Sequence, residues 1–217
     1  MRRLYIIVEG QTEQEFVSQT LAPYFQSQGI YNITPILIHT SKTGKGGFVN
    51  YEHLKNDVTR FLNSEKDIIV STFVDFFRIP TSVPKYEDSM RLNSDNDKVE
   101  SLEQAMFESI SDTRFIPYIQ LHEFEALLFS SNKGFEGYCE EPVHKQTKLI
   151  VDDYENPEDI NSSLETAPSK RILKINPAYD KVLEGNLIAL EVGINSILDR
   201  CPRFREWVKK LIAEVEK

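Results

Sequence analysis

The fold of this chain is decided near its start, by the stretch LYIIVEGQTE at residues 4–13. The run from Leu4 to Val8 is continuous, apolar and rich in β-branched residues, which is typical of a strand buried on both faces of a parallel sheet. Glu9 ends the run, and the spacing of Thr12 and Glu15 predicts a capping box at the start of a helix. We therefore expect Glu9 at the carboxyl end of a central strand, where open α/β sheets bind ligands.

A helix that starts directly after a strand often binds phosphate through its free N–H groups. In this chain Glu9 and Glu13 crowd the same place, and their negative charges would repel a bare phosphate. A divalent cation between the carboxylates and a phosphate removes this conflict. The stretch therefore predicts a metal site that handles a phosphate group.

Composition sets the limits on fold and function. The chain has 217 residues, 40% of them apolar, with 13 Phe and 9 Tyr, which is enough for a folded core. The net charge of -9 excludes a generally basic nucleic-acid coat but not a local basic groove. Cys139 and Cys201 have no zinc-like spacing and form no disulfide framework.

The hydrophobic pattern contains no candidate membrane segment. Each apolar run is shorter than the roughly 20 residues that span a bilayer. The basic start, residues 1–3, precedes an apolar run too short for a signal peptide. We expect a cytoplasmic protein with no membrane partner.

A second buried strand also ends in an acid. Residues 67–75, DIIVSTFVD, form the strongest strand pattern in the chain, and alternation of strands with helices predicts a parallel sheet. In a parallel sheet, Asp75 emerges at the same edge as Glu9, so the two carboxylates converge. An alternative is that Asp75 only caps the turn before Arg78. The pattern alone leaves both interpretations open.

Two further strands are predicted at residues 33–38 and 114–121, and Pro35 and Pro117 mark them as edge or bulged strands. The composition changes after residue 130, and most of the remaining pattern is helical. The sequence predicts an α/β domain at residues 1–130, with a mostly parallel sheet of about four strands flanked by helices. A helical C-terminal region, residues 131–217, is expected to pack on it.

The loop TSKTGKGG at residues 40–47 is rich in glycine and lysine, but it lacks the Walker order of glycines, Lys and Ser or Thr. ATP binding is therefore not expected here. Lys42 and Lys45 are candidates for contact with a phosphate backbone. A solvated flexible loop is the competing interpretation.

Several stretches resemble known families. VEGQTEQEF at residues 8–16 closely resembles the opening motif of Toprim domains, in particular the nuclease domains of the overcoming-lysogenization-defect (OLD) family. The chain is more specifically similar to the Toprim-related bacterial domain-of-unknown-function family 4276. The resemblance covers nearly the whole chain, through the motifs DFFRIP (75–80), HEFE (122–125), NPEDIN (156–161), APSKRI (167–172) and CPRF (201–204).

The resemblance implies a Toprim-like sheet with helices on both faces, acids at strand ends that bind Mg²⁺ or Mn²⁺, and phosphodiester chemistry on nucleic acid. Glu9 matches the acid after the first strand, and Glu13 matches the second acid of the OLD motif. Asp75 matches the first acid of the Toprim Asp-x-Asp pair. Phe77 stands where the second acid belongs, and it cannot ligate a metal. Glu9 and Asp75 are the implied catalytic acids.

Other residues are candidates to complete the site. Glu123 is our candidate for an additional metal ligand, and His122 and Asp88 are alternatives. OLD nucleases also use a lysine beyond the acidic cluster. Lys170, with its neighbour Arg171, is the candidate for this catalytic cation.

Two functions follow from the resemblance. The first is a metal-dependent nuclease or nuclease-related component of a phage-defence system. The alternative is a catalytically degenerate Toprim-like module that docks to a partner ATPase, and Phe77 favours this alternative. Families of this kind are often encoded beside ABC-type or SMC-like ATPases, so the resemblance implies such a partner.

Overall fold

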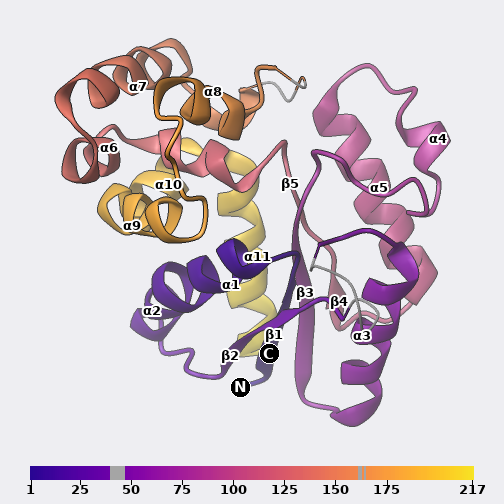
Figure 1. Cartoon of the computed structure of the whole chain (residues 1–217). Coiled ribbons are helices and arrows are strands. Elements are labelled where there is room, and N and C mark those ends of the chain that lie inside the picture. Colours follow the sequence, from indigo (N-terminus) through magenta and orange to yellow (C-terminus); the bar gives the residue numbers. More distant parts are fainter. Residues whose placement is uncertain (40–46, 161–162, 164) are drawn as a thin grey trace.

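The computed structural model describes residues 1–39, 47–160, 163 and 165–217, so Lys42 and Lys45 lie outside the described residues. Its centre is a five-stranded sheet in the order β2-β1-β3-β4, with β5 also paired to β3 (Figure 1). Every strand pair is parallel. The prediction of an α/β fold with a mostly parallel sheet is confirmed. The strands are β1 (Arg3–Val8), β2 (Ile33–Leu37), β3 (Ile68–Asp75), β4 (Phe115–Ile116) and β5 (Ile119–Gln120).

Helices cover both faces of the sheet (Figure 1). One face packs against α1 (Gln11–Phe16), η1 (Val17–Leu21), α2 (Ala22–Ser27) and α11 (Pro202–Glu216). The other face packs against α3 (Tyr51–Ser64) and α5 (Asp95–Ile110), and α4 (Tyr86–Ser89) packs on α5. A helical region follows, made of η2 (Phe124–Ser130), α6 (Lys133–Tyr138), α7 (Glu141–Asp153), η3 (Pro157–Asp159), α8 (Pro168–Ile175), α9 (Leu183–Val192) and α10 (Ile194–Arg200).

The continuous apolar run of β1 feeds two separate cores, because successive side chains of a strand point to opposite faces. Leu4, Ile6 and Val8 belong to the core under α1 and α11. Tyr5 and Ile7 belong to the core under α3 and α5. Both cores are closed to solvent along β1, which is why this strand shows no alternation of apolar and polar residues.

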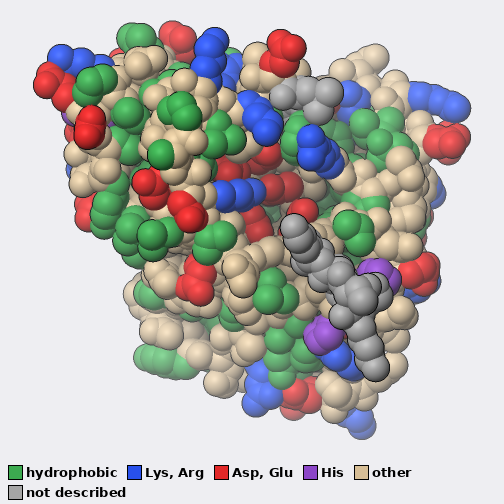
Figure 2. All heavy atoms as spheres, in the orientation of Figure 1, with side chains coloured by type: hydrophobic (Ala, Val, Ile, Leu, Met, Phe, Trp, Pro, Cys, Tyr) green, Lys and Arg blue, Asp and Glu red, His purple; other side chains and the backbone are tan. Residues whose placement is uncertain are grey.

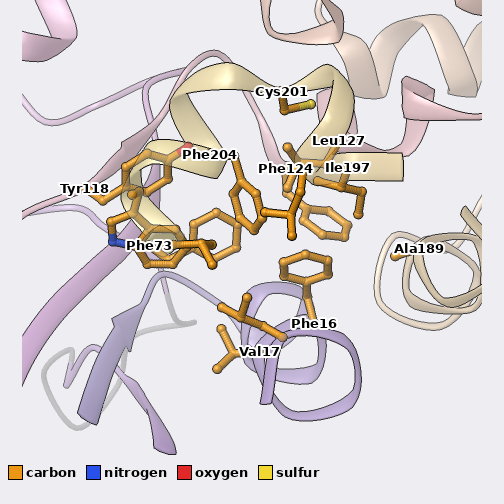
Figure 3. Packing of buried hydrophobic residues seen from close by; sticks show 14 of the residues in the cluster. Phe16, Val17, Phe73, Tyr118, Phe124, Leu127, Ala189, Ile197, Cys201 and Phe204 are labelled. Atoms are coloured by element: carbon orange, nitrogen blue, oxygen red, sulfur yellow. The ribbon is translucent and has the colours of Figure 1, made fainter. Parts of the chain in front are cut away.

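Aromatic rings join the helical C-terminal region to the sheet (Figure 3). Phe16 of α1 lies 5.7 Å from Phe73 of β3, 5.2 Å from Phe124 of η2 and 5.9 Å from Phe204 of α11, measured between ring centroids. One hydrophobic cluster therefore spans residues on both sides of position 130. The domain boundary placed there stays a prediction.

Helix α11 is fixed to the sheet by one tryptophan. The Trp207 ring stacks on Tyr118 at 4.4 Å and on Phe73 at 5.5 Å. Its Nε1–H donates a hydrogen bond of 2.9 Å to Ser71 Oγ in the middle of β3. A buried indole N–H needs such a partner, so this bond sets the register of the helix against the strand.

The prolines act at the edges of the sheet, as predicted. Pro35 lies in β2, the outermost strand on one side. Pro117 divides the predicted strand 114–121 into β4 and β5. Thr72 Oγ1 bridges the break, since it accepts from Tyr118 N and donates to Tyr118 O, both at 2.8 Å.

The predicted capping box is wrong. The N-cap of α1 is Gly10 in an extended conformation, and Thr12 is buried inside the first turn. The strand runs directly into the helix and leaves no residue free to cap it with a side chain. A Cβ at Gly10 would lie 3.2 Å from Glu13 Oε2, so the glycine lets the Glu13 carboxylate lie close to the backbone. Glu15 instead accepts a hydrogen bond from Gln19.

Candidate functional site

Three of the predicted acids meet at the carboxyl edge of the sheet. Glu9 follows β1, Glu13 lies in the first turn of α1, and Asp75 ends the neighbouring strand β3. The Asp75 N–H donates to Glu9 Oε2 at 3.3 Å. Lys181 Nζ lies 3.6 Å from both Glu13 Oε1 and Asp75 Oδ2. In Figure 2, acidic side chains fill a hollow on the face shown, with basic side chains around it.

A fourth acid, Glu125, completes the cluster, although the sequence did not single it out. Its side chain is fully buried, and its Oε2 lies 3.3 Å from Lys181 Nζ. Neither of its carboxylate oxygens receives a hydrogen bond from the described residues. The Phe124 N–H, one residue earlier, donates to Asp75 Oδ1 at 2.9 Å. This bond joins the start of η2 to the end of β3 and so brings Glu125 to Asp75.

Lys181 is the cation of the cluster, and sequence reasoning missed it. It lies between Asp180 and the first residues of α9. Asp180 Oδ1 accepts from Leu183 N, and Glu184 Oε2 accepts from Asp180 N, which is the reciprocal pattern of a capping box. A lysine at a helix N-terminus opposes the helix dipole. The unfavourable position of this positive charge was the one sequence feature that could have indicated that Lys181 pairs with acids elsewhere in the fold.

The charges in the cluster do not balance. Burial raises the pKa of Glu9, and the charge of Glu13 raises it further. Burial raises the pKa of Asp75 well above its ordinary value, although Lys181 opposes the shift. Burial also raises the pKa of Glu125 to about 7. The cluster therefore holds more acids than one ammonium can pair with, and its buried carboxyl groups take up protons more readily than exposed ones.

For Lys181, burial and the neighbouring charges act on the pKa in opposite directions. Burial alone would favour its neutral amine, but the carboxylates of Asp75, Glu125 and Glu13 raise its pKa well above the ordinary value. The ammonium form is thus the stable one at neutral pH, and the exposure of 38% of the side chain to solvent also favours it.

Glu123, the predicted additional metal ligand, binds the protein itself. Its carboxylate accepts hydrogen bonds from Ser169 N at 2.9 Å and from Ser169 Oγ at 3.0 Å. Ser169 lies in the first turn of α8, so Glu123 holds the N-terminus of that helix. Glu158 does the same for α11, because it accepts from Arg203 N at 2.8 Å and from Phe204 N at 3.1 Å.

The two alternatives to Glu123 lie in other surroundings. His122 is buried in a left-handed conformation, with φ of 69°, and its carbonyl accepts from Phe77 N at 2.8 Å. Burial lowers its pKa, with Asp95 and Asp159 opposing. The Asp88 side chain is 78% exposed and pairs with Arg91 at 3.3 Å.

The two predicted catalytic cations lie on α8. Arg171 donates from Nε to Thr166 O at 2.8 Å and from Nη2 to Tyr154 OH at 3.1 Å, so its guanidinium joins α8 to neighbouring segments. Lys170 is half-buried and follows Ser169 in the same turn. In the described structure the ammonium at the acids belongs to Lys181 and not to Lys170.

The donor set suits a hard divalent cation, because Mg²⁺ and Mn²⁺ prefer carboxylate oxygens. Glu13 Oε1 and both oxygens of Glu125 are buried without a hydrogen-bond donor from residues 1–39, 47–160, 163 and 165–217. In that same part of the chain, no group of three His, Cys, Asp or Glu side chains is already arranged around one ion. The acids point toward Lys181 instead. Ion binding by Glu9, Glu13 and Asp75 would therefore require these side chains to rotate.

A cleft of about 800 Å³ opens beside Glu9. Its size is that of a typical small-ligand site. Its lining combines the start of α1 with the edge strand β2 and one residue before α9: Glu9, Gly10, Gln11, Gln14, Pro35, Ile36, Leu37, Ile38, His39 and Val182. Two smaller cavities, of about 440 and 390 Å³, share Glu103 between α5 and α11 and include none of the clustered acids.

The comparisons with known proteins give a family and no activity. No curated protein and no solved structure matches the chain. Within its described part, the chain has no helix that is both long and apolar enough to cross a bilayer. One family matches residues 8–212, which include the whole acidic cluster and Lys181. By this match the chain belongs to the family described as "Domain of unknown function (DUF4276)".

Proposed function

We propose that this protein is a metal-dependent phosphodiesterase that acts on nucleic acid, related to the Toprim nuclease domains of the OLD family. The observation that carries the proposal is the convergence of Glu9, Glu13 and Asp75 at one sheet edge beside a cleft. Raised pKa values, as at Glu9 and Asp75, in buried acids beside a half-buried lysine are typical of a reactive site.

The roles of the residues follow from their positions. A bound Mg²⁺ or Mn²⁺ supplies charge neutralisation for the phosphate and lowers the pKa of a bound water. Glu9 and Glu13 would hold the ion at the mouth of the cleft. Asp75 connects the two ends of the cluster, because its N–H donates to Glu9 and its carboxylate pairs with Lys181. The Lys181 ammonium stabilises negative charge that develops on the phosphate. Gln11 and Gln14 line the cleft and can donate hydrogen bonds to phosphate or sugar oxygens.

The test is Asp75→Asn in the full chain. Asparagine keeps the oxygen that accepts from Phe124 N and replaces the charged oxygen that faces Lys181. Labelled single- and double-stranded DNA and RNA are incubated with Mn²⁺, and circular dichroism checks the fold. We expect wild-type cleavage to fall by about 100-fold or more. Glu15→Gln is the matched control, because Glu15 bonds only to Gln19 outside the cluster. If Asp75→Asn cleaves like the wild type, the proposed site is wrong.

Two observations favour a second function, a binding module that docks to an ABC-type or SMC-like ATPase, in a phage-defence system. Phe77 supplies no ligand oxygen, and the acids of the described structure point toward Lys181. This module needs no ion. Equilibrium dialysis against millimolar Mn²⁺ separates the two functions. Bound Mn²⁺ that Asp75→Asn weakens supports the phosphodiesterase, and its absence supports the module.

A further inference from the structure

We propose that His39 is the general acid of the proposed phosphodiesterase, and that its Nε2 gives a proton to the oxygen that leaves phosphorus during hydrolysis. This inference rests on the proposed function and adds a residue that the sequence did not single out. Two observations carry it: His39 lines the cleft beside Glu9, and the buried Asp57 holds its ring.

His39 lies at the same edge of the sheet as Glu9. The last register pair of β1 and β2 joins Val8 to Leu37, and Ile38 N donates to Val8 O at 3.1 Å. Glu9 directly follows Val8, and His39 directly follows Ile38. Both side chains belong to residues that line the cleft of about 800 Å³. A substrate bound in this cleft would therefore contact the imidazole as well as the carboxylate.

Asp57 of α3 holds the imidazole through the ring nitrogen Nδ1. Its Oδ2 accepts from His39 N at 2.8 Å, and its Oδ1 lies 3.1 Å from His39 Nδ1. The Asp57 side chain is only 6% exposed, and it also pairs with Arg60 at 3.2 Å. A carboxylate accepts hydrogen bonds, so Nδ1 is the nitrogen that keeps its proton. Nε2 is then the nitrogen that exchanges a proton with a bound group or with solvent.

The contact at Nδ1 is not needed to hold the backbone. The bond from His39 N to Asp57 already ties the end of β2 to α3. The His39 side chain is 65% exposed, and ion pairs at exposed side chains contribute little to stability. The main effect of the second contact is therefore to fix the orientation and the tautomer of a ring at the cleft. A carboxylate has the same effect on an acid–base histidine in hydrolytic enzymes.

In the proposed step, a water oxygen forms a bond to phosphorus, and the bond between phosphorus and the leaving oxygen breaks. The electron pair of the broken bond stays on the leaving oxygen, which takes the proton from His39 Nε2. The water's proton passes to solvent, and solvent returns a proton to the exposed ring. Among the described charged groups, Asp57 contacts the ring, Arg60 pairs with Asp57, and Glu9 shares the cleft.

The first measurement compares two phosphodiesters that differ in their leaving group. The full-length protein is assayed with Mn²⁺ on labelled nucleic acid and on the p-nitrophenyl ester of thymidine monophosphate, whose p-nitrophenolate leaves without a proton. We expect His39→Gln to slow nucleic-acid cleavage by about 100-fold or more, and ester cleavage by less than about threefold. His144→Gln, on α7, is the matched control and should leave both rates unchanged. Circular dichroism checks the fold of both variants.

The second measurement does not depend on catalysis. Nitrogen-15 NMR of the histidine rings, in alkaline buffer with EDTA, reports which nitrogen of the neutral ring carries the proton. We expect Nδ1 in the wild type, with the His39 signals assigned by their loss in His39→Gln. Asp57→Asn should move the proton to Nε2, because the asparagine amide can donate to Nδ1. It should also slow nucleic-acid cleavage while sparing the ester.

The outcomes separate this assignment from the proposed function. Equal losses on the two substrates in His39→Gln, or nucleic-acid cleavage at the rate of His144→Gln, overturn the assignment of His39. A wild-type ring with its proton on Nε2 overturns it as well. If the wild type cleaves no nucleic acid, the proposed function itself is overturned.

Discussion

Replacing Lys181 with methionine should destabilise the protein in the presence of a chelator. The change keeps the apolar stem of the side chain and removes the ammonium that faces Glu13, Asp75 and Glu125. Each of these pairs, at a separation of about 3.5 Å and an effective dielectric constant of about 20, attracts by roughly 5 kcal/mol. This gross attraction is offset by the desolvation of the lysine and by solvent screening at its exposed 38%.

The net change in the free energy of unfolding depends on how the carboxylates respond to the loss of the ammonium. Breaking a buried ion pair typically costs about 3–5 kcal/mol, and we reduce this to about 2–3 kcal/mol for the exposure of Lys181. For a chain of this length, that lowers the melting temperature by roughly 5–10 °C. The carboxylates can also take up protons, because their pKa values are already raised. The loss should therefore be larger at pH 8 than at pH 6.

The assay is thermal unfolding in EDTA at both pH values, followed by the fluorescence of Trp207, the single tryptophan. Lys170→Met is the control for the loss of a half-buried lysine, and we expect a smaller change than in Lys181→Met because the Lys181 ammonium, and not that of Lys170, faces the acids. The reasoning is refuted if Lys181→Met is as stable as Lys170→Met, or if its loss is equal at pH 6 and pH 8. Such a result would mean that the acids do not depend on the ammonium.

Two further predictions concern the acids outside the cluster. Burial raises the pKa of Glu103 to about 7, above its ordinary 4.5, so its contribution to stability is present at low pH and is lost as the pH rises through 7. Between pH 6 and 8 this amounts to about 1.4 kcal/mol, and the unfolding free energy of Glu103→Gln should vary less with pH by that amount. If the unfolding free energy of Glu103→Gln varied with pH as much as that of the wild type, the prediction would be contradicted. Glu123→Gln should cost about 1–2 kcal/mol in thermal unfolding, because one of the two Ser169 donors loses its acceptor, with Mn²⁺ affinity unchanged. A large loss of Mn²⁺ affinity in this variant would instead assign Glu123 to the ion.

The strand ends could be predicted because their cause is local. A β-branched apolar run that stops at an acid predicts both the strand and the place of the acid, and parallel pairing then brings Glu9 and Asp75 to one edge. The prolines likewise predict the edges, because proline cannot donate to a strand ladder. The start of α1 was mispredicted, since an N-cap side chain was assumed where Gly10 and a buried Thr12 stand.

The positions of Glu125 and Lys181 in the cluster depend on contacts between residues far apart in the sequence. Glu123 and Glu125 lie two residues apart in similar sequence surroundings, yet one turns to α8 and the other to Lys181. Their partners, Ser169 and Lys181, lie 46 and 56 residues further along the chain, so no local pattern indicates them. Lys181 comes close because α9 packs on α1 and on η2, whereas Lys170 was chosen from its neighbouring motif.

The packing of α11 on β1 has a consequence for the order of folding. The residue before the first strand is bonded to the last helix, since Arg2 N donates to Val215 O, and Phe204 and Trp207 close the core above β3. During synthesis, β1, β2 and β3 therefore leave the ribosome long before the helix that covers them. One face of the newly synthesised sheet therefore stays exposed until α11 is available. Contacts between residues so far apart in the sequence also form slowly. The exposed apolar face should therefore make the nascent chain prone to aggregation until α11 has been made.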